Sequence, residues 1–364
     1  MTRKRWAVVV LWAAALALLA GVLRAVPLDD AWAALQQLRF WQIGVLAAAN
    51  GLVLLALNGR WWFILRGQGQ RIPFRALLGY RLAAFGLSYF TPGPHFGGEP
   101  LQVYLVEKLH GAPRPVAIAA MTLDKLLELL VNFTFLLGGV VVILRSRALG
   151  RTLGVEEETA VFAALLAALP LLFLAATWAD WRPVSRLLGW VWRRPLWRTR
   201  PLADELLARA TRTLHASEAA AAHFCRRAPL SLFLALLASL LSWAAMIGEF
   251  WLMVAFLGIP LTLTQLIVAL TAARVAYLLL LPGGLGALEV SQAFAFGALG
   301  LNPAVGISAS LLIRARDVGL GLLGLWWGGR RLRFSRVTAT VGALIPGTTV
   351  EATPQPLDQG GSIS

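Results

Sequence analysis

The stretch TPGPHFGGEP, residues 91–100, interrupts a chain that is otherwise mostly apolar. It combines prolines and glycines with His95 and Glu99, and neither proline nor glycine favours the interior of a helix. The chain as a whole is 58% hydrophobic and 14% charged. Several of its apolar runs reach the roughly 20 residues needed to cross a bilayer core. The sequence therefore predicts an all-α, polytopic integral membrane protein that contains a helix break at membrane depth.

The apolar runs fall into two kinds, uninterrupted and interrupted. Two regions, about 74–110 and 264–300, are each cut in the middle by proline and glycine. We expect these two regions to form re-entrant helical hairpins. If each instead crosses the membrane twice, the loops that follow stay on the same side, so the charges of the loops fit both alternatives. The uninterrupted runs predict six full spans, at 6–26, 41–59, 116–144, 159–179, 229–257 and 303–328.

The distribution of basic residues predicts the orientation in the membrane. Arg3, Lys4 and Arg5 precede the first run, which places the N-terminus in the cytoplasm by the positive-inside rule. The net charge of +15 would suggest nucleic acid in a soluble protein, but here cytoplasmic loops account for it, so we expect no nucleic-acid partner. We expect an inner-membrane protein with both termini in the cytoplasm. Five arginines place the segment 60–81 in a cytoplasmic loop: Arg60, Arg66, Arg71, Arg75 and Arg81.

Residues 180–228 differ in composition from the spans. Several tryptophans, among them Trp181, Trp190 and Trp197, alternate with arginines, which is typical of a helix lying in the headgroup layer. Anionic lipid would attract such an arm with about 1 kcal/mol per basic residue. A solvated cytoplasmic linker with ordinary interfacial tryptophans is the alternative. Residues 337–364 are rich in Thr, Pro, Gly and Ser, which predicts a disordered tail after a membrane domain over 1–336.

The second interrupted region, LLLLPGGLGALEVSQ, repeats the pattern of the first. Glu99 and Glu289 are 190 positions apart, and so are Asp124 and Arg314 in the apolar runs that follow. The prolines and glycines of the two breaks keep the same spacing. The pattern predicts two repeat units, about 41–145 and 229–335, joined by the span at 159–179 and the basic arm.

The number of crossings between the units predicts how they are related. Three crossings separate the two hairpins if both are re-entrant, so the second unit is inverted with respect to the first. Inverted repeats with broken helices near the midplane are a recurring plan of transporters. Non-helical backbone at that depth is tolerated where it is buried in protein or lines a watery cavity.

Charged residues inside the apolar runs are the candidate substrate-binding groups. Each costs about 2.5–3.5 kcal/mol at the centre of a span, so they cannot all stay unpaired. One interpretation is that their ion pairs merely hold the bundle together. The other is that they line a polar cavity in which arginines meet a lipid phosphate and carboxylates meet cationic groups. The charged candidates are Arg81, Glu99, Asp124, Lys125, Glu128, Arg274, Glu289, Arg314, Arg316 and Asp317, and Glu249 is a further buried charge.

Other chemistry has little support in the sequence. The single cysteine, Cys225, excludes an intrachain disulfide and a multi-cysteine metal site. His95 and Glu99 lack an obvious third ligand. GGLGALE is glycine-rich but has no flanking strand, which a dinucleotide fingerprint requires. We therefore expect no metal, no cofactor and no enzymatic activity.

Together, PGPHFGGEPLQVYLV, LPGGLGALE, LDKLLELL and LLIRARD resemble the membrane region of lysylphosphatidylglycerol synthases and their stand-alone, flippase-like relatives. The similarity covers about residues 5–335 and implies a lipid translocator. In the synthases a soluble aminoacyl-transferase domain follows this region, and we expect no lysyl transfer here. The resemblance carries over these site residues: Gly97, Gly98, Glu99, Pro282, Gly283, Gly284, Gly286 and Glu289.

The resulting hypothesis is flippase-like movement of a polar lipid between leaflets. An anionic or aminoacylated phospholipid and a polyprenyl-linked lipid are the candidate substrates. The alternatives are a membrane enzyme of lipid-linked sugar or isoprenoid metabolism with Glu99 or Asp124 as general base, a scaffold for a lipid-synthesis enzyme, and a small-solute transporter. The expected partners are membrane lipids, anionic headgroups at the basic arm, and a second copy of the chain or a lipid-synthesis enzyme.

Overall fold

The computed structural model of the chain describes residues 36, 38–90, 98–182, 184–186, 201–278 and 286–331. Within these ranges every regular element is a helix. Four helices are long and apolar enough to cross a membrane: α3 (Phe40–Gly67), α6 (Arg114–Arg145), α8 (Glu157–Trp178) and α11 (Pro229–Phe256). They confirm the spans predicted at 41–59, 116–144, 159–179 and 229–257, and the protein is an integral membrane protein.

Two of the predicted spans have a different outcome. Helix α14 (Pro303–Arg331) is 29 residues long, which is ample for a bilayer core. Arg314, Arg316 and Asp317 lie within it, and it is not among the helices that are apolar enough by composition alone. The run at 6–26 lies outside the described residues, as does the tail at 337–364.

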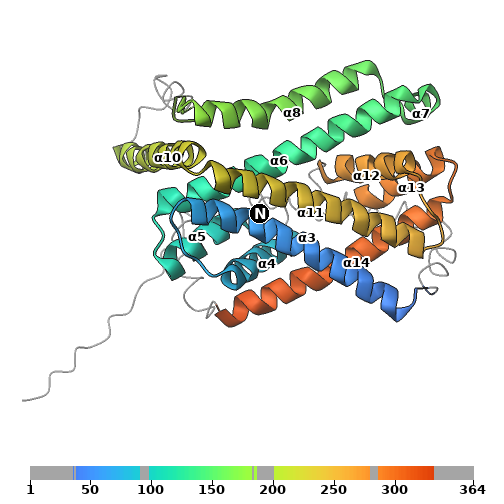
Figure 1. Ribbon diagram of the computed structural model, residues 1–364, viewed down its shortest axis with the longest axis horizontal. Helices are drawn as coiled ribbons and strands as arrows, with labels where there is room; N and C mark the ends of the chain where they lie inside the picture. The colour runs from blue at the N-terminus through green and yellow to red at the C-terminus, as the bar shows by residue number, and fades with distance from the viewer. Residues whose placement is uncertain are drawn as a thin grey trace, which may run out of the picture.

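Four shorter helices form two pairs. Helices α4 (Phe74–Phe90) and α5 (Glu99–His110) contact each other, and so do α12 (Leu263–Leu278) and α13 (Ala287–Ala298). Each has at most 17 residues, fewer than the roughly 20 that a full crossing requires. The two pairs lie at opposite ends of the bundle, with α4 and α5 at the same end as α10 (Figure 1).

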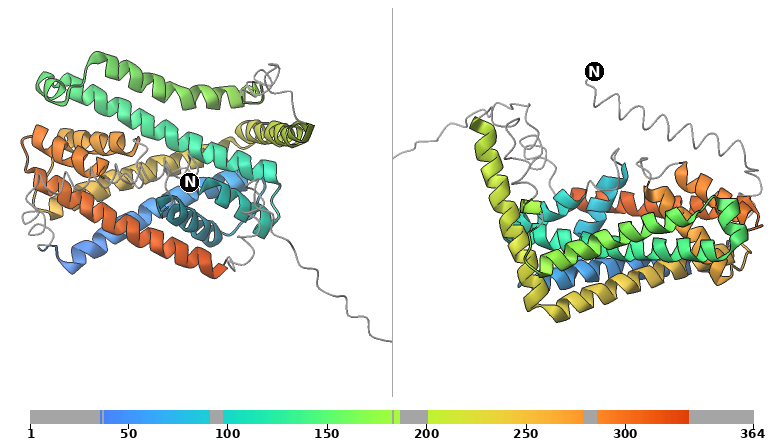
Figure 2. Two further views of the ribbon diagram at one scale, coloured as in Figure 1. Left: turned by 180° about the vertical axis from the view of Figure 1, so that it is seen from behind. Right: turned by 90° about the horizontal axis from the view of Figure 1, so that it is seen from above.

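Packing between the two halves of the chain holds the bundle together. Helix α3 packs along α11, and α14 packs along α4, so both contacts join segments far apart in sequence (Figures 1 and 2). Helix α8 lies beside α6 on the outside of the bundle, connected to it through the short helix α7 (Arg147–Leu153). One apolar core contains Trp61, Leu77 and Leu123, and a second contains Phe250 and Leu288.

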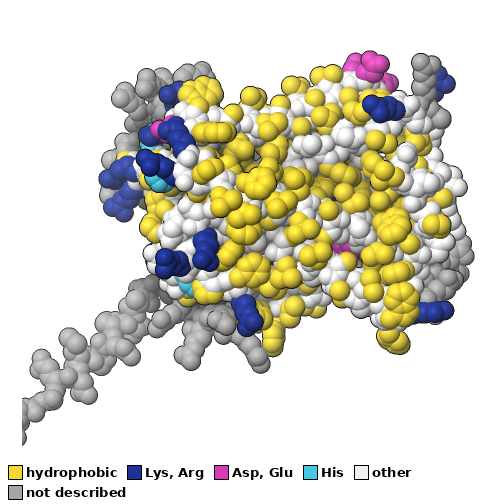
Figure 3. All heavy atoms as spheres, viewed as in Figure 1, with side chains coloured by type: hydrophobic (Ala, Val, Ile, Leu, Met, Phe, Trp, Pro, Cys, Tyr) yellow, Lys and Arg dark blue, Asp and Glu magenta, His cyan; other side chains and the backbone are white. Residues whose placement is uncertain are grey.

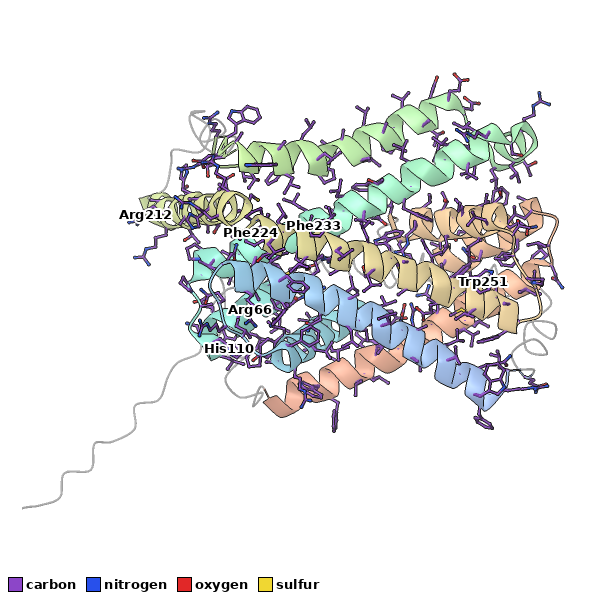
Figure 4. All side chains as sticks on the ribbon, viewed as in Figure 1. Arg66, His110, Arg212, Phe224, Phe233 and Trp251 are labelled. Atoms are coloured by element: carbon purple, nitrogen blue, oxygen red, sulfur yellow. The ribbon has the colours of Figure 1, made fainter. Side chains whose placement is uncertain are left out.

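The surface of the bundle is suited to a bilayer. Apolar side chains cover the middle of the face in Figure 3, whereas Lys and Arg gather at its left end. Arg66, His110 and Arg212 lie at that end, and Trp251 lies toward the other (Figure 4). Exposed leucine and phenylalanine side chains such as Leu169 and Phe233 form the kind of large apolar surface that marks contact with a membrane.

Helix α10 (Pro201–Arg227) runs across one end of the bundle, transverse to the long helices (Figure 2, right). It contacts α6, α8 and α11. At its C-terminal end the ring of Phe224 packs so closely against Gly67, at the end of α3, that a Cβ there would collide with it. The structure thus places a helix within the arm predicted at 180–228, while Trp190 and Trp197 lie outside the described residues.

Candidate functional site

Buried charges gather in two groups, one in each half of the chain. The first cluster is defined by Arg60, Arg81, Glu99, Asp124, Lys125 and Glu128. The second cluster is defined by Glu249, Arg274, Glu289, Arg314, Arg316 and Asp317. Each contains three acidic and three basic side chains, so each is formally neutral.

Arg60 is the centre of the first cluster. Its side chain, on α3, is fully buried, and its guanidinium donates two hydrogen bonds to the carboxylate of Asp124, at 2.7 and 3.1 Å. It also donates to Glu128 Oε2 at 3.0 Å and to Ser239 Oγ of α11 at 3.1 Å. Arg81 of α4 also donates to Asp124, at Oδ2, with a distance of 3.0 Å. Fork-like arginine–carboxylate pairs of this kind fix the geometry of the side chains they join.

A second set of contacts in the first cluster anchors the start of α5. Lys125 Nζ lies 3.1 Å from Glu99 Oε1 and 3.2 Å from Glu128 Oε1. Glu99 is in the first turn of α5, where a carboxylate also interacts favourably with the helix dipole. The break at residues 91–97 is therefore followed directly by a side chain that is tied to α6.

The second cluster repeats this arrangement on α13 and α14. Glu289 lies in the first turn of α13, and Arg314 Nε is 2.9 Å from its Oε1. The Glu99–Lys125 and Glu289–Arg314 pairs thus each link the first turn of a hairpin's second helix to the next long helix. Arg316 is shared by two carboxylates, Glu249 and Asp317, each at 2.8 Å.

Crossed hydrogen bonds connect α3 and α11 near the two clusters. Asn50 Nδ2 of α3 donates to Glu249 Oε2 of α11 at 3.2 Å, and Arg60 of α3 donates to Ser239 of α11. Asn50 and Ser239 are 189 positions apart, as are Arg60 and Glu249. By this spacing Asn50 corresponds to Ser239, and Arg60 corresponds to Glu249. On each helix the neutral polar side chain therefore bonds to the charged side chain of the other helix.

Arg274 is the member of the second cluster that lacks a carboxylate. Among the described residues it forms no ion pair, and its Nε has no hydrogen-bond partner. Its guanidinium carbon lies 4.6 Å from the ring centre of Trp243, and one of its terminal nitrogens contacts the sulfur of Met246. Stacking on an aromatic face stabilises a cation only modestly, so Arg274 retains the capacity to bind an anion.

A cavity of about 50 Å³ borders Arg274. Holding one water takes about 10–15 Å³, so the cavity has room for several water-sized groups. Its polar lining is Glu249, Arg274, Tyr277 and Arg316, and the remainder is apolar, including Met246, Phe250, Leu270 and Ile313. The cavity lies among α11, α12 and α14.

Two of the predicted glycines have identifiable roles in the breaks. Gly98 caps the start of α5, and a Cβ there would collide with the backbone carbonyl of Ala84 on α4. Gly286 precedes α13 with φ +78°, a conformation that favours glycine. Gly98 thus allows close packing within one pair, and Gly286 allows the chain to turn in the other. Gly97, Pro282, Gly283 and Gly284 lie outside the described residues, as does His95.

The interpretation of Arg60 as a loop residue was wrong. Helix α3 extends to Gly67, so the predicted span ended too early, and the connection to α4 is confined to residues 68–73. Arg60 can lie inside the helix bundle because Asp124 and Glu128 on α6 offset its charge. Arg75 and Arg81 likewise belong to α4 rather than to a loop.

The basic arm forms a second polar site, at the end of α8. A cavity of about 310 Å³ is lined by Asp180, Arg182, His223, Arg226 and Arg227. Arg182 Nε lies 3.0 Å from Asp180 Oδ1, and this hydrogen bond lowers the pKa of Asp180. Arg226 donates to the carbonyl oxygen of Trp178 at 2.7 Å. These contacts tie α10 to α8.

The helices and their internal ion pairs define a polytopic membrane protein with charged clusters inside an apolar bundle. The sequence matches the family model described as the lysylphosphatidylglycerol synthase TM region over residues 6–324. The chain therefore belongs to that family, which confirms the resemblance. It is similar to a UPF0104 membrane protein of Methanothermobacter thermautotrophicus, with 24% identity over 277 residues that cover 74% of this chain and 79% of the relative. No solved structure matches it.

Proposed function

We propose that this protein moves a polar lipid between the two leaflets of the cell membrane, without changing the lipid covalently. The observation that carries the proposal is the pair of equivalent ion pairs, Glu99–Lys125 and Glu289–Arg314, each at the first turn that follows a break. Placing charged side chains in an apolar bundle is costly, and such residues mark substrate pathways in membrane proteins.

The arrangement of the two halves supports an inverted repeat. The pairs α4–α5 and α12–α13 lie at opposite ends of the bundle (Figure 1). The contact of α4 with α14 has a counterpart in the contact of α12 with α6, and α3 packs on α11, its own counterpart. In this proposal both pairs are re-entrant hairpins, six helices span the bilayer, and the two units alternate in opening the interior to each side.

The orientation that we propose places α10 on the cytoplasmic side of the inner membrane. Support comes from the gathering of Lys and Arg at that end of the bundle (Figure 3), as the positive-inside rule requires. The transverse course of α10 (Figure 2, right) suits a helix that contacts anionic headgroups through its arginines. Both termini are cytoplasmic in this orientation.

The lipid substrate in this proposal is an anionic or aminoacylated phospholipid or a polyprenyl-linked lipid. Such lipids share a phosphate on an apolar tail, and the bundle offers arginines beside apolar walls. The Glu128 side chain, 39% exposed, is the most accessible acid of the first cluster and is available to a cationic group of an aminoacylated headgroup. We propose that the interior between the clusters passes the headgroup while the acyl or prenyl chains stay in the bilayer.

A leaflet-accessibility assay tests the proposal. Purified protein is reconstituted into liposomes that carry fluorescent phospholipids, and the fraction reached by an external quencher is followed with time. We expect movement with the wild type and its loss in Glu99→Gln. Glu107→Gln is the matched control, because Glu107 lies on the same helix and its ion pairs within the described residues are with Lys108 and Arg114 near the surface.

Two results would contradict the proposal. One is that the wild type moves no fluorescent phospholipid or polyprenyl lipid in the series. The other is that Glu99→Gln moves lipid as fast as Glu107→Gln. Mass spectrometry of the recovered lipids tests the absence of covalent change, since a new lipid product would instead indicate a membrane enzyme.

A further inference from the structure

Arg274 differs from every other basic member of the two clusters in its electrostatic surroundings. Arg60, Arg81, Lys125, Arg314 and Arg316 each lie within 3.2 Å of at least one carboxylate oxygen. Arg274 has a tryptophan ring and a thioether beside it instead, and its buried Nε has no hydrogen-bond partner among the residues that the structure describes. A buried hydrogen-bond donor without an acceptor is costly, and a charged one is more so.

The neighbouring arginine does not compete for the same ligand. Arg316 also borders the cavity, but Glu249 and Asp317 already occupy its donors at 2.8 Å. An anion entering the cavity would therefore gain most from Arg274, because no described carboxylate forms an ion pair with its guanidinium. Glu249 also lines the cavity, and its carboxylate would repel an anion placed near it.

The shape and lining of the cavity indicate the chemical class of the anion. A volume of about 50 Å³ accommodates a few oxygen-sized atoms, about the requirement of one phosphate group. Arginine binds phosphate through parallel N–H donors that match the spacing of its oxygens. Six apolar side chains complete the lining, namely Met246, Phe250, Met253, Leu270, Ala273 and Ile313, which suits a phosphate that carries an apolar body.

We infer that the cavity beside Arg274 is a binding site for one lipid phosphodiester group, with Arg274 as its anion-binding residue. This inference rests on the proposed function and adds to it the residue that holds the phosphate. The phosphate oxygens accept hydrogen bonds from the Arg274 guanidinium, including its Nε. The glycerol and the first carbons of the chains lie against the apolar lining. Free inorganic phosphate is the other source of the same chemistry.

Native mass spectrometry of the full chain in detergent measures this binding directly. The probes are dioleoylphosphatidylglycerol, dioleoylglycerol with the same chains and no phosphate, and inorganic phosphate. We expect the wild type to bind the phospholipid about tenfold more tightly than dioleoylglycerol. Arg274→Gln should abolish this preference, and Arg274→Lys should restore part of it, because lysine keeps the charge without the fork of donors.

The control is Arg66→Gln. Arg66 also stacks on a tryptophan, Trp62, with 4.9 Å between its guanidinium carbon and the ring centre, but it lies at the end of the bundle (Figure 4) and does not line the cavity. We expect it to keep the wild-type preference. Arg274→Gln should also unfold at the same temperature as the wild type or higher in lipid-free detergent, because it removes a charge without a carboxylate partner.

The possible outcomes answer three separate questions: whether the anion site exists, which anion occupies it, and whether the protein moves lipid. Displacement of the phospholipid by inorganic phosphate would support the anion site and identify free phosphate as an occupant, and its absence would identify the lipid. An unchanged phospholipid preference in Arg274→Gln would overturn the inference. Because binding is measured without leaflets, that failure is distinct from a failure of lipid movement in liposomes.

Discussion

The first and second clusters contain equal numbers of acids and bases but distribute them differently. In the first, two carboxylates surround the fully buried Arg60, and Arg81 completes the set around Asp124. In the second, Arg316 takes two carboxylates while Arg274 takes none and borders a cavity. The comparison indicates that every base of the first cluster has a carboxylate partner, whereas the second cluster leaves one arginine beside a cavity without one. The same formal charge can therefore leave an anion-binding arginine in one half and not in the other.

The largest expected difference between the clusters is in the unfolding free energy that is lost when Arg60 of the first cluster or Arg274 of the second is replaced. Arg60→Gln leaves the fully buried Asp124 with less compensation, and we expect a loss of about 3–5 kcal/mol in unfolding free energy. Arg274→Gln should cost nothing or stabilise the protein. Thermal unfolding of both variants in the same detergent measures the difference. Equal losses would mean that the two clusters play the same structural role.

Replacing the corresponding glutamates of the two hairpins should produce a smaller difference in unfolding free energy than replacing the two arginines. Glu289 is 1% exposed, whereas Glu99 is 19% exposed. Removing the charge of the buried member takes from Arg314 the carboxylate that lies 2.9 Å from it, so Glu289→Gln should cost about 3 kcal/mol. Glu99→Gln should cost about 1 kcal/mol or less, since solvent screens a partly exposed pair. Chemical denaturation in mixed micelles compares them, and a larger loss in Glu99→Gln would reverse the comparison.

Contact between the halves can be tested at two adjacent glycines of α6. A Cβ on Gly139 would collide with the side chain of Thr271 on α12, whereas a Cβ on Gly138 meets nothing within 4 Å. We expect Gly139→Ala to destabilise the protein by about 1–3 kcal/mol. Gly138→Ala should gain about 0.4–1 kcal/mol, because alanine loses less backbone entropy in a helix. If the two variants have the same stability, α6 and α12 do not pack as described.

The smallest expected effects concern the crossed bonds between α3 and α11. Ser239→Ala removes one hydrogen bond to Arg60, and Asn50→Ala removes one to Glu249. Each loss should be about 1 kcal/mol, and the two should be similar if the helices are equivalent by the repeat. Unfolding temperatures of the two single variants and of the double variant provide the measurement. A strong effect in one and none in the other would argue against that equivalence.

Much of this architecture could be predicted from the sequence, because the length of an apolar run and the presence of a charged residue within it can be read from the sequence locally. These two properties predicted four spans, both breaks and the charged candidates. The 190-residue spacing of Glu99 and Glu289 predicted two repeat units, and in the structure each glutamate pairs with a base on the next long helix.

The pairing of charges could not be predicted in the same way. In the sequence Arg60 resembles a loop residue, because the carboxylate that offsets its charge, Asp124 on α6, lies 64 positions away. The isolation of Arg274 is likewise a property of packing, since Glu249, Glu289 and Asp317 are all taken by other arginines. Asn50 and Ser239 carried no signal in the sequence, although their equal spacing to Arg60 and Glu249 would have indicated them once the helix pair was known.

One measurement tests directly whether the cavity of the second cluster is open to a polar ligand while the packed core beside the first cluster is closed. Single cysteines replace Met246 at the cavity, Leu123 in the core beside the first cluster, and Leu240 on the outer face of α11. The native Cys225 is replaced by serine; its thiol is in any case a poor nucleophile, since burial raises the pKa of Cys225 to about 11. The reagent is an anionic methanethiosulfonate applied to protein in liposomes, and the readout is the mass of the labelled chain.

We predict labelling of Met246→Cys, slowed by dioleoylphosphatidylglycerol in the liposomes. Leu123→Cys and Leu240→Cys should stay unlabelled, because one is buried in packed side chains and the other faces lipid, where no thiolate forms. Labelling of Leu123→Cys, or a Met246→Cys that stays as unlabelled as Leu240→Cys, would contradict an open cavity in the second cluster.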